Sequence, residues 1–298
     1  MAISTGSHPK DLWPGVKAHF GHTYDEHPEE FSQIFDAESS DKGWEERVQY
    51  KGLGLATVKG QGEPIDFSDT QQGYISRITN VVYGKGGIVT REAIEDGQYE
   101  SVAMRISRYI AFSIRQTEEN VGANVLNRAF NSSYTGGDGV ELCSLVHEGD
   151  QSNHLTVAAD ISEAAIEDML IQIMLSTDAE GLKISLIGQK LVSPPQQIFE
   201  SCRILDSMLQ NDTSDNAINA LKAKGMLPGG VVVNHYLSDA DAWFIKTNAP
   251  EGMIVQNRRA VEFGKDNDFS TENALMKGTI RKGYGWADWR GLFGSPGV

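Results

Sequence analysis

The stretch that decides the fold runs from residue 96 to residue 131 and reads DGQYESVAMRISRYIAFSIRQTEENVGANVLNRAFN. Apolar residues recur at i, i+3 and i+4 throughout it, polar residues fill the other positions, and no proline interrupts. This spacing predicts one helix over 96–131. A helix of about 30 residues is about 45 Å long, well beyond the mean of about 11–12 residues. It is therefore expected to act as a spine and not as an element of a small core.

The residues before this helix are expected to form an arm and a hairpin. Residues 1–47 are acidic, and three prolines argue against a long helix there, so we expect an arm that lies over another surface. Residues 48–90 are rich in β-branched and aromatic residues on either side of a turn-rich connection. They predict an antiparallel hairpin with a polar tip near 62–68. Because a lone hairpin is marginal in water, it must pack on the same chain or on a neighbour.

The residues after the helix have mixed α/β character. Ser162 is the expected N-cap of a helix over 162–175. Apolar strands are expected at 186–192, 231–237 and 243–246, with a helix from Pro195 to about Leu209 between the first two. Residues 250–298 return to β-like segments. The fold class predicted from these patterns is α+β.

Composition excludes several classes of protein. The 298 residues hold 26 Lys and Arg against 41 Asp and Glu, a net charge of −15, which argues against a nucleic-acid-binding surface. Two cysteines, Cys143 and Cys202, specify no disulfide framework and favour a reducing compartment. No apolar run approaches the ~18 residues of a membrane span, and the N-terminus has no signal-like apolar region. We expect neither a membrane partner nor secretion.

Catalytic motifs are also missing. The sequence has no phosphate-binding loop, no dinucleotide fingerprint after a strand, no nucleophile elbow and no H-E-x-x-H. Four of the seven histidines lie in the arm, where solvated side chains are favoured over a metal cluster: His8, His19, His22 and His27. We therefore expect no enzyme, no cofactor and no metal.

Five short segments carry a resemblance to a known family. They are NVLNRAF (124–130), GGDGVELCSLVHEG (136–149), GQKLVSPPQQIFESCRILDS (188–207), VVVNHYLSDADAWFI (231–245) and GTIRKGYGWADWRGLFGS (278–295). In this order they resemble the major capsid protein of tailed bacteriophages, over roughly 120–298. The first 120 residues resemble that family in architecture only.

The resemblance implies a fold and a function. It implies an N-terminal arm (1–47), an extended β-hairpin loop (48–95), a peripheral domain (96–159 and 249–298) with the spine helix 96–131, and an axial domain (160–248). It further implies self-assembly as pentamers and hexamers into an icosahedral shell around double-stranded DNA, without sequence-specific binding. The shell is expected in the virion, assembled in the bacterial host cytoplasm.

The resemblance also implies partners. Because the long helical N-terminal segment that some relatives cleave off is absent, we expect no such cleavage and a separate scaffolding protein. A portal and a decoration protein are further expected partners. Two alternatives remain open: an encapsulin-type nanocompartment shell, which shares the fold, and a metabolic α/β enzyme with an unrecognised site.

Candidate contacts between subunits follow from charge and from aromatic anchors. Acidic residues at the hairpin tip need basic partners, and Trp and Arg are common anchors at interfaces. Closure of the chain's own core is an equal alternative for Trp286 and Trp289, and a solvated strand edge is the alternative for the Arg258–Arg259 pair. The candidates are Glu63, Asp66, Asp69, Arg258, Arg259, Arg281, Lys282, Trp286, Asp288, Trp289 and Arg290.

Overall fold

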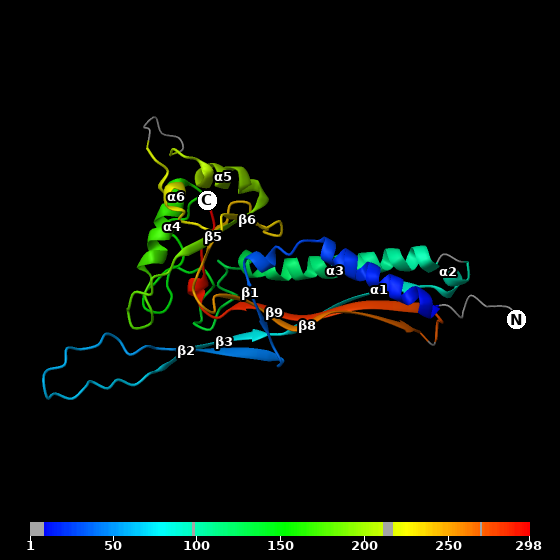
Figure 1. The fold of residues 1–298 in the computed structure, drawn as a ribbon, viewed down its shortest axis with the longest axis horizontal. Coiled ribbons are helices and arrows are strands. Elements are labelled where there is room, and N and C mark those ends of the chain that lie inside the picture. The colour runs from blue at the N-terminus through cyan, green and yellow to red at the C-terminus, as the bar shows by residue number, and fades with distance from the viewer. Residues whose placement is uncertain (1–8, 97–98, 211–216, 269) are drawn as a thin grey trace.

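The computed structural model describes residues 9–96, 99–210, 217–268 and 270–298, so His8 lies outside the described residues. It has two packed bodies and a projecting hairpin (Figure 1). The first body holds a four-stranded sheet of order β1-β8-β9-β4, in which β1 is parallel to β8 and the other pairs are antiparallel. Its strands are β1 (Asp36–Ser39), β4 (Val81–Val89), β8 (Met253–Asn267) and β9 (Ala274–Trp286).

The predicted spine helix is confirmed as α3 (Tyr99–Asn127), which follows the short α2 (Arg91–Glu95). It packs against β4 and β9 of the sheet, with α1 (Pro9–Glu26) beside it (Figure 1). Gly278 of β9 makes this close packing possible: a Cβ there would lie 2.3 Å from Cδ1 of Ile114. The apolar face that the 3.6-residue period predicted is therefore the face that meets the sheet.

The prediction of an irregular arm over 1–47 is wrong for residues 9–26, which form the helix α1. Val16, Phe20 and Tyr24 recur every four residues and are buried, and Phe20 stacks on Phe263 of β8 at 4.5 Å between ring centroids. Burial against α3 and the sheet outweighs the helix-breaking effect of Pro14, as tertiary packing commonly overrides propensity. The arm continues through η2 (Phe31–Gln33) into β1, so it contributes a strand to the first sheet.

The second body is a four-stranded sheet of order β10-β7-β5-β6 covered by helices. Ser162 caps α4 as predicted, since its side chain accepts a hydrogen bond from the Ala165 amide. The elements are α4 (Glu163–Leu175), β5 (Gly188–Ser193), η3 (Pro195–Gln197), α5 (Ile198–Asp206), α6 (Ala220–Lys224), β6 (Val231–Val233), β7 (Trp243–Thr247), η4 (Trp289–Gly291) and β10 (Leu292–Ser295).

The prediction that all of 249–298 belongs with the spine helix in one domain needs a correction at the end of the chain. β10 pairs antiparallel with β7, so residues 292–295 complete the second sheet. Its residues Leu292 and Phe293 are fully buried. β10 is covered on both faces, because Phe293 belongs to the apolar core of the second body, whereas Leu292 belongs to an apolar cluster that also includes Leu126 of α3.

The hairpin is shorter than predicted. β2 (Trp44–Tyr50) pairs antiparallel with β3 (Gln72–Thr79), whereas β4 leaves for the first sheet. Asn80 separates the two: its Nδ2 donates to Ser40 Oγ at 2.8 Å and to the Lys42 carbonyl at 3.0 Å. The expected hairpin over 48–90 is thus corrected to a stem within 44–79. Its distal part projects away from both bodies (Figure 1).

Candidate functional site

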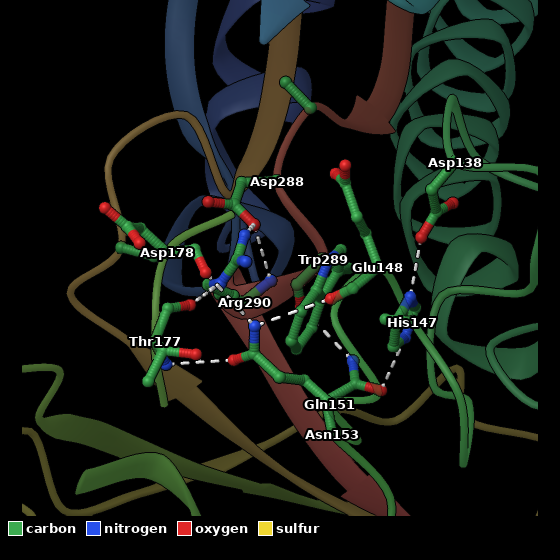
Figure 2. A network of polar contacts seen from close by, with 12 residues as sticks. Asp138, His147, Glu148, Gln151, Asn153, Thr177, Asp178, Asp288, Trp289 and Arg290 are labelled. Carbon is green, nitrogen blue, oxygen red and sulfur yellow. Dashed lines mark hydrogen bonds and ion pairs between the residues drawn. The ribbon is translucent and has the colours of Figure 1, made fainter. Parts of the chain in front are cut away.

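Two of the motifs that carried the resemblance meet in one buried polar network (Figure 2). The His147 ring is stacked on Trp289, with 4.2 Å between ring centroids and 4° between the planes. On the other side, the Arg290 guanidinium lies 4.4 Å from the Trp289 ring centroid. Nδ1 of His147 lies 2.6 Å from Oδ2 of Asp138. The network therefore joins the 136–149 segment to the 278–295 segment.

Asn153 fixes the orientation of the imidazole ring. Its Nδ2 donates to the carbonyls of Leu142 (2.7 Å), Trp289 (3.2 Å) and Leu292 (2.8 Å). Its Oδ1 is consequently the acceptor that faces Nε2 of His147 at 2.9 Å. Both ring nitrogens thus face oxygen atoms, and the ring is held between Asn153 and Asp138 (Figure 2).

Arg290 is held from within its own chain. Its Nη1 lies 3.1 Å from Asp288 Oδ1, and its Nε donates to the Thr177 carbonyl at 3.0 Å. Arg290 is only 2% exposed and Trp289 only 1%. The expectation that these two side chains contact a neighbouring subunit is therefore corrected: they close the chain's own core, the alternative that the sequence left open for the tryptophan.

A second buried cluster fastens α1 and β9 to the spine helix. The fully buried Glu118 carboxylate on α3 accepts from the Tyr24 hydroxyl at 2.5 Å and lies 2.5 Å from Lys282 Nζ and 3.2 Å from Arg115 Nη1. Lys282 is itself only 8% exposed, so it is also corrected from a subunit contact to an internal ion pair. Burial and the nearby Glu118 charge raise the pKa of Tyr24.

Glu119, the next residue of α3, holds the arm by backbone contacts. Its carboxylate accepts from the amides of Glu30 (3.0 Å) and Phe31 (3.1 Å). Burial raises its pKa to about 7, although the two amide donors lower it. None of these buried charges was evident from the sequence, because helical periodicity does not reveal which polar residues point inward.

The remaining basic candidates lie nearer the surface. Arg281 Nε donates to the Asn80 carbonyl at 3.5 Å, and Trp286 is partly buried against Gly136. Arg258 lies 3.6 Å from Asp41 of the chain's own arm, and Arg259 lies 3.6 Å from Glu262. These four keep part of their surface exposed, and their contacts in an assembly stay a prediction.

The hairpin tip is less polar than predicted. Glu63 accepts from the Gly60 amide at 3.1 Å, while Asp66 and Asp69 are exposed and have no ion-pair partner among the described residues. Among the residues from 51 to 71, none is assigned to a strand. Large apolar side chains project from this stretch into solvent: Leu53 (58% exposed), Leu55 (82%), Val58 (98%), Ile65 (62%) and Phe67 (88%).

Groups suited to cofactor or metal chemistry are sparse in the described ranges. These residues contain no cluster of three or more His, Cys, Asp or Glu that could hold a metal ion. In the arm, His22 pairs with Glu26 at 3.2 Å. Cys143 is buried, and that burial raises the pKa of its thiol, which opposes nucleophilic chemistry. No helix within the described residues has the length and apolar character needed to cross a membrane.

Comparison with solved structures finds capsid particles. The chain is similar to the capsid of the native GTA particle (TM-score 0.58, 10% identity, 89% of each chain covered). It is also similar to a virus-like particle from Pyrococcus furiosus (0.54, 9% identity, 95% of this chain and 98% of that chain) and to Mycobacterium phage Che8 (0.53, 13% identity, 89% of each chain). At these identities the likeness concerns the fold.

Comparison with curated proteins finds no match. A family model described as "Phage capsid protein" matches residues 75–294, which include α3, both four-stranded sheets for the most part, and the network of Figure 2. This match confirms the resemblance and the α+β capsid fold that the sequence motifs indicated. The chain therefore belongs to the phage capsid protein family and is a structural, non-enzymatic component of a virion shell.

Proposed function

We propose that this chain is the major head protein of a tailed bacteriophage. It assembles as pentamers and hexamers into an icosahedral shell that encloses double-stranded DNA. The first body serves as the peripheral domain, the second body as the axial domain near the capsomer centre, and the hairpin lies across a neighbouring subunit. Assembly takes place in the host cytoplasm, and a scaffolding protein, a portal and a decoration protein are the proposed partners.

One observation carries this proposal: the distal loop, residues 52–71, displays apolar side chains that nothing in the described chain covers. Burying a Leu, Ile, Val or Phe side chain contributes about 1.5–3 kcal/mol. Five such side chains offer roughly 7–15 kcal/mol of gross stabilisation to a partner surface. A second copy of the chain in a lattice provides this cover repeatedly, which also offsets the cost of ordering the loop.

The charge of the chain fits a container for DNA. With 26 cationic and 41 acidic residues, the net charge is −15. An acidic inner wall repels phosphate, so packaged DNA and wall can slide past each other. In the proposed shell, the acidic tip of the loop (Glu63, Asp66, Asp69) meets basic side chains of the neighbour. Arg258 and Arg259 meet the acidic arm of a neighbour, and Arg281 is a further contact candidate. Trp286 and Asp288 are retained as further contact candidates.

Negative-stain electron microscopy of the expressed chain tests the proposal. We expect closed particles or capsomers from the wild-type chain, with or without a co-expressed scaffolding protein. The Leu55→Ser/Phe67→Ser variant removes two exposed apolar anchors and should leave folded but unassembled chains. Val157→Ser, at an apolar residue that is 77% exposed on the second body, is the matched control and should assemble normally.

The contents of the particles discriminate between the two shell hypotheses. Particles that package DNA when the phage genome is present support the proposed head protein. Particles that enclose a cargo enzyme and exclude DNA favour the encapsulin-type compartment. Monomers or dimers alone, under all these conditions, contradict both.

A further inference from the structure

We propose that Lys51 and Glu148 form an electrostatic latch that sets the direction in which the distal loop (52–71) leaves the protein. Nζ of Lys51 lies 2.6 Å from Oε1 of Glu148, and the two side chains are 29% and 26% exposed. Lys51 follows directly after β2 in the hairpin, whereas Glu148 adjoins His147 in the buried polar network (Figure 2). The ion pair therefore connects the hairpin to a different part of the fold.

The position of the pair explains why it can control direction. The Lys51 amide donates to the Gln71 carbonyl at 2.8 Å, which is the last backbone contact between the two arms of the hairpin before the loop opens. Gly52 and Gly54 follow at once, and Gly54 has a φ of 75° that favours glycine. A flexible segment begins at this point, so a contact at Lys51 fixes the angle at which the segment starts.

The hairpin stem, residues 44–50 and 72–79, stays in place through other contacts. Ser76 Oγ donates to the Ala287 carbonyl at 3.1 Å. Gly137 packs so closely that a Cβ there would lie 2.7 Å from the Ile75 carbonyl oxygen. Since these contacts and the Asn80 turn hold the stem, loss of the Lys51–Glu148 pair frees the loop without detaching the stem.

The charges around the Lys51–Glu148 pair determine how the loop responds when the pair is broken. A Cβ on Gly52 would lie 3.6 Å from Asp178 Oδ2 and 3.9 Å from Glu180 Cγ, so further acidic residues border the start of the loop. The loop itself carries one lysine and three acidic residues, a net charge of 1 − 3 = −2. With the latch closed, Lys51 neutralises this acidic edge. When the ion pair is broken, the acidic residues at this edge repel the acidic loop, and the loop moves away from them.

The surroundings make the latch responsive to the solution. A cavity of about 550 Å³ lies beside the pair, lined in part by Lys51, Tyr74, Asp138, His147 and Glu148. Hydrogen bonding and charge attraction from Glu148 raise the pKa of Lys51, which keeps the lysine charged. Because both partners are partly exposed, salt screens their attraction. This inference concerns the individual chain and does not depend on what a shell encloses.

A distance measurement on the unassembled full chain tests the latch. Spin labels are placed at Val58→Cys on the loop and Val157→Cys on the second body, in a Cys202→Ser background. The wild-type chain should show a narrow distance distribution. Lys51→Gln should broaden it at least two-fold and move its centre to longer distance. Lys59→Gln, at an exposed lysine of the same loop with no ion-pair partner among the described residues, is the control and should leave it unchanged.

Two further arms keep the result decisive. Glu148→Gln should reproduce the effect of Lys51→Gln, and the swapped pair Lys51→Glu/Glu148→Lys should restore the narrow distribution. For the labelled chain with Lys51 and Glu148 intact, raising NaCl to about 0.5 M should also broaden the distribution by screening. Single variants that remain as narrow as wild type, or a swapped pair as broad as the single variants, would overturn the proposal.

Discussion

Replacing Glu118 by Gln tests whether a buried ion cluster holds the arm and β9 on the spine helix. The change keeps the shape of the side chain and removes its charge. Lys282 Nζ, 2.5 Å from the Glu118 carboxylate and 8% exposed, is then left without its partner. Arg115 keeps Glu29 at 2.6 Å, so the cost falls mainly on the lysine.

Breaking one side of a buried pair costs about 3–5 kcal/mol. We expect the lower end, about 3 kcal/mol, because the amide oxygen of Gln can still accept a hydrogen bond. For a chain of this size, that loss lowers the midpoint of thermal unfolding by about 6–12 °C. Circular dichroism of the unassembled chain at neutral pH, by heat and by urea, measures both quantities.

Two comparison variants make the Glu118 result interpretable. Glu200→Gln breaks the exposed Glu200–Arg203 pair, whose side chains are 42% and 68% exposed, and should change stability by less than about 0.5 kcal/mol. Adding Lys282→Met to Glu118→Gln removes the unpaired charge and should recover most of the loss. If Glu118→Gln and the wild-type chain unfold at the same temperature and urea concentration, the reasoning that this charge is both buried and needed by Lys282 is refuted.

Three further predictions follow from other parts of the fold. Burial raises the pKa of Glu119 from 4.5 to about 7. The folded state therefore binds the carboxyl proton more tightly than the unfolded state does, which contributes about 3 kcal/mol of stability that is lost as the pH rises through about 7. Glu119→Gln should remove this pH dependence of the free energy of unfolding, measured by urea titration between pH 5 and 8. Gly278→Val forces a side chain against Ile114 and should cost about 1–3 kcal/mol in the same assay, whereas Gly264→Val, whose Cβ would meet Lys277 only at 3.5 Å, should not. The Asp66→Lys/Asp69→Lys variant should impair particle formation without lowering the unfolding midpoint, and normal particles seen by electron microscopy would contradict that role.

The long helix shows what the local sequence pattern can and cannot predict. The apolar period over 96–131 predicted α3 (Tyr99–Asn127) because every turn repeats the same burial. It did not predict that Glu118 and Glu119 point into the interior, since both occupy positions that a polar face tolerates equally well. Their inward placement depends on Lys282 and on the arm, which come from distant parts of the chain.

The arm and the hairpin were misjudged for a related reason. Pro14 argues against a helix when the segment is considered alone, yet Val16 and Phe20 find cover on α3 and the sheet. Likewise, no turn-forming pair separates β3 from β4, and only the bonds from Asn80 to Ser40 and Lys42 show where one sheet ends and the other begins. Propensity describes a segment in isolation, whereas burial depends on its neighbours.

The amino-acid sequence by itself determined the mixed helix and sheet class, the spine helix, the capped helix after Ser162 and, through its ordered motifs, the capsid family. Only the tertiary structure decided that Asp138 and His147 meet Trp289 and Arg290, and that β10 joins the second sheet. The physical reason is that periodicity and capping report interactions within a few residues along the chain. Stacking, buried ion pairs and sheet order arise between segments far apart, where many partners are chemically acceptable and packing selects one.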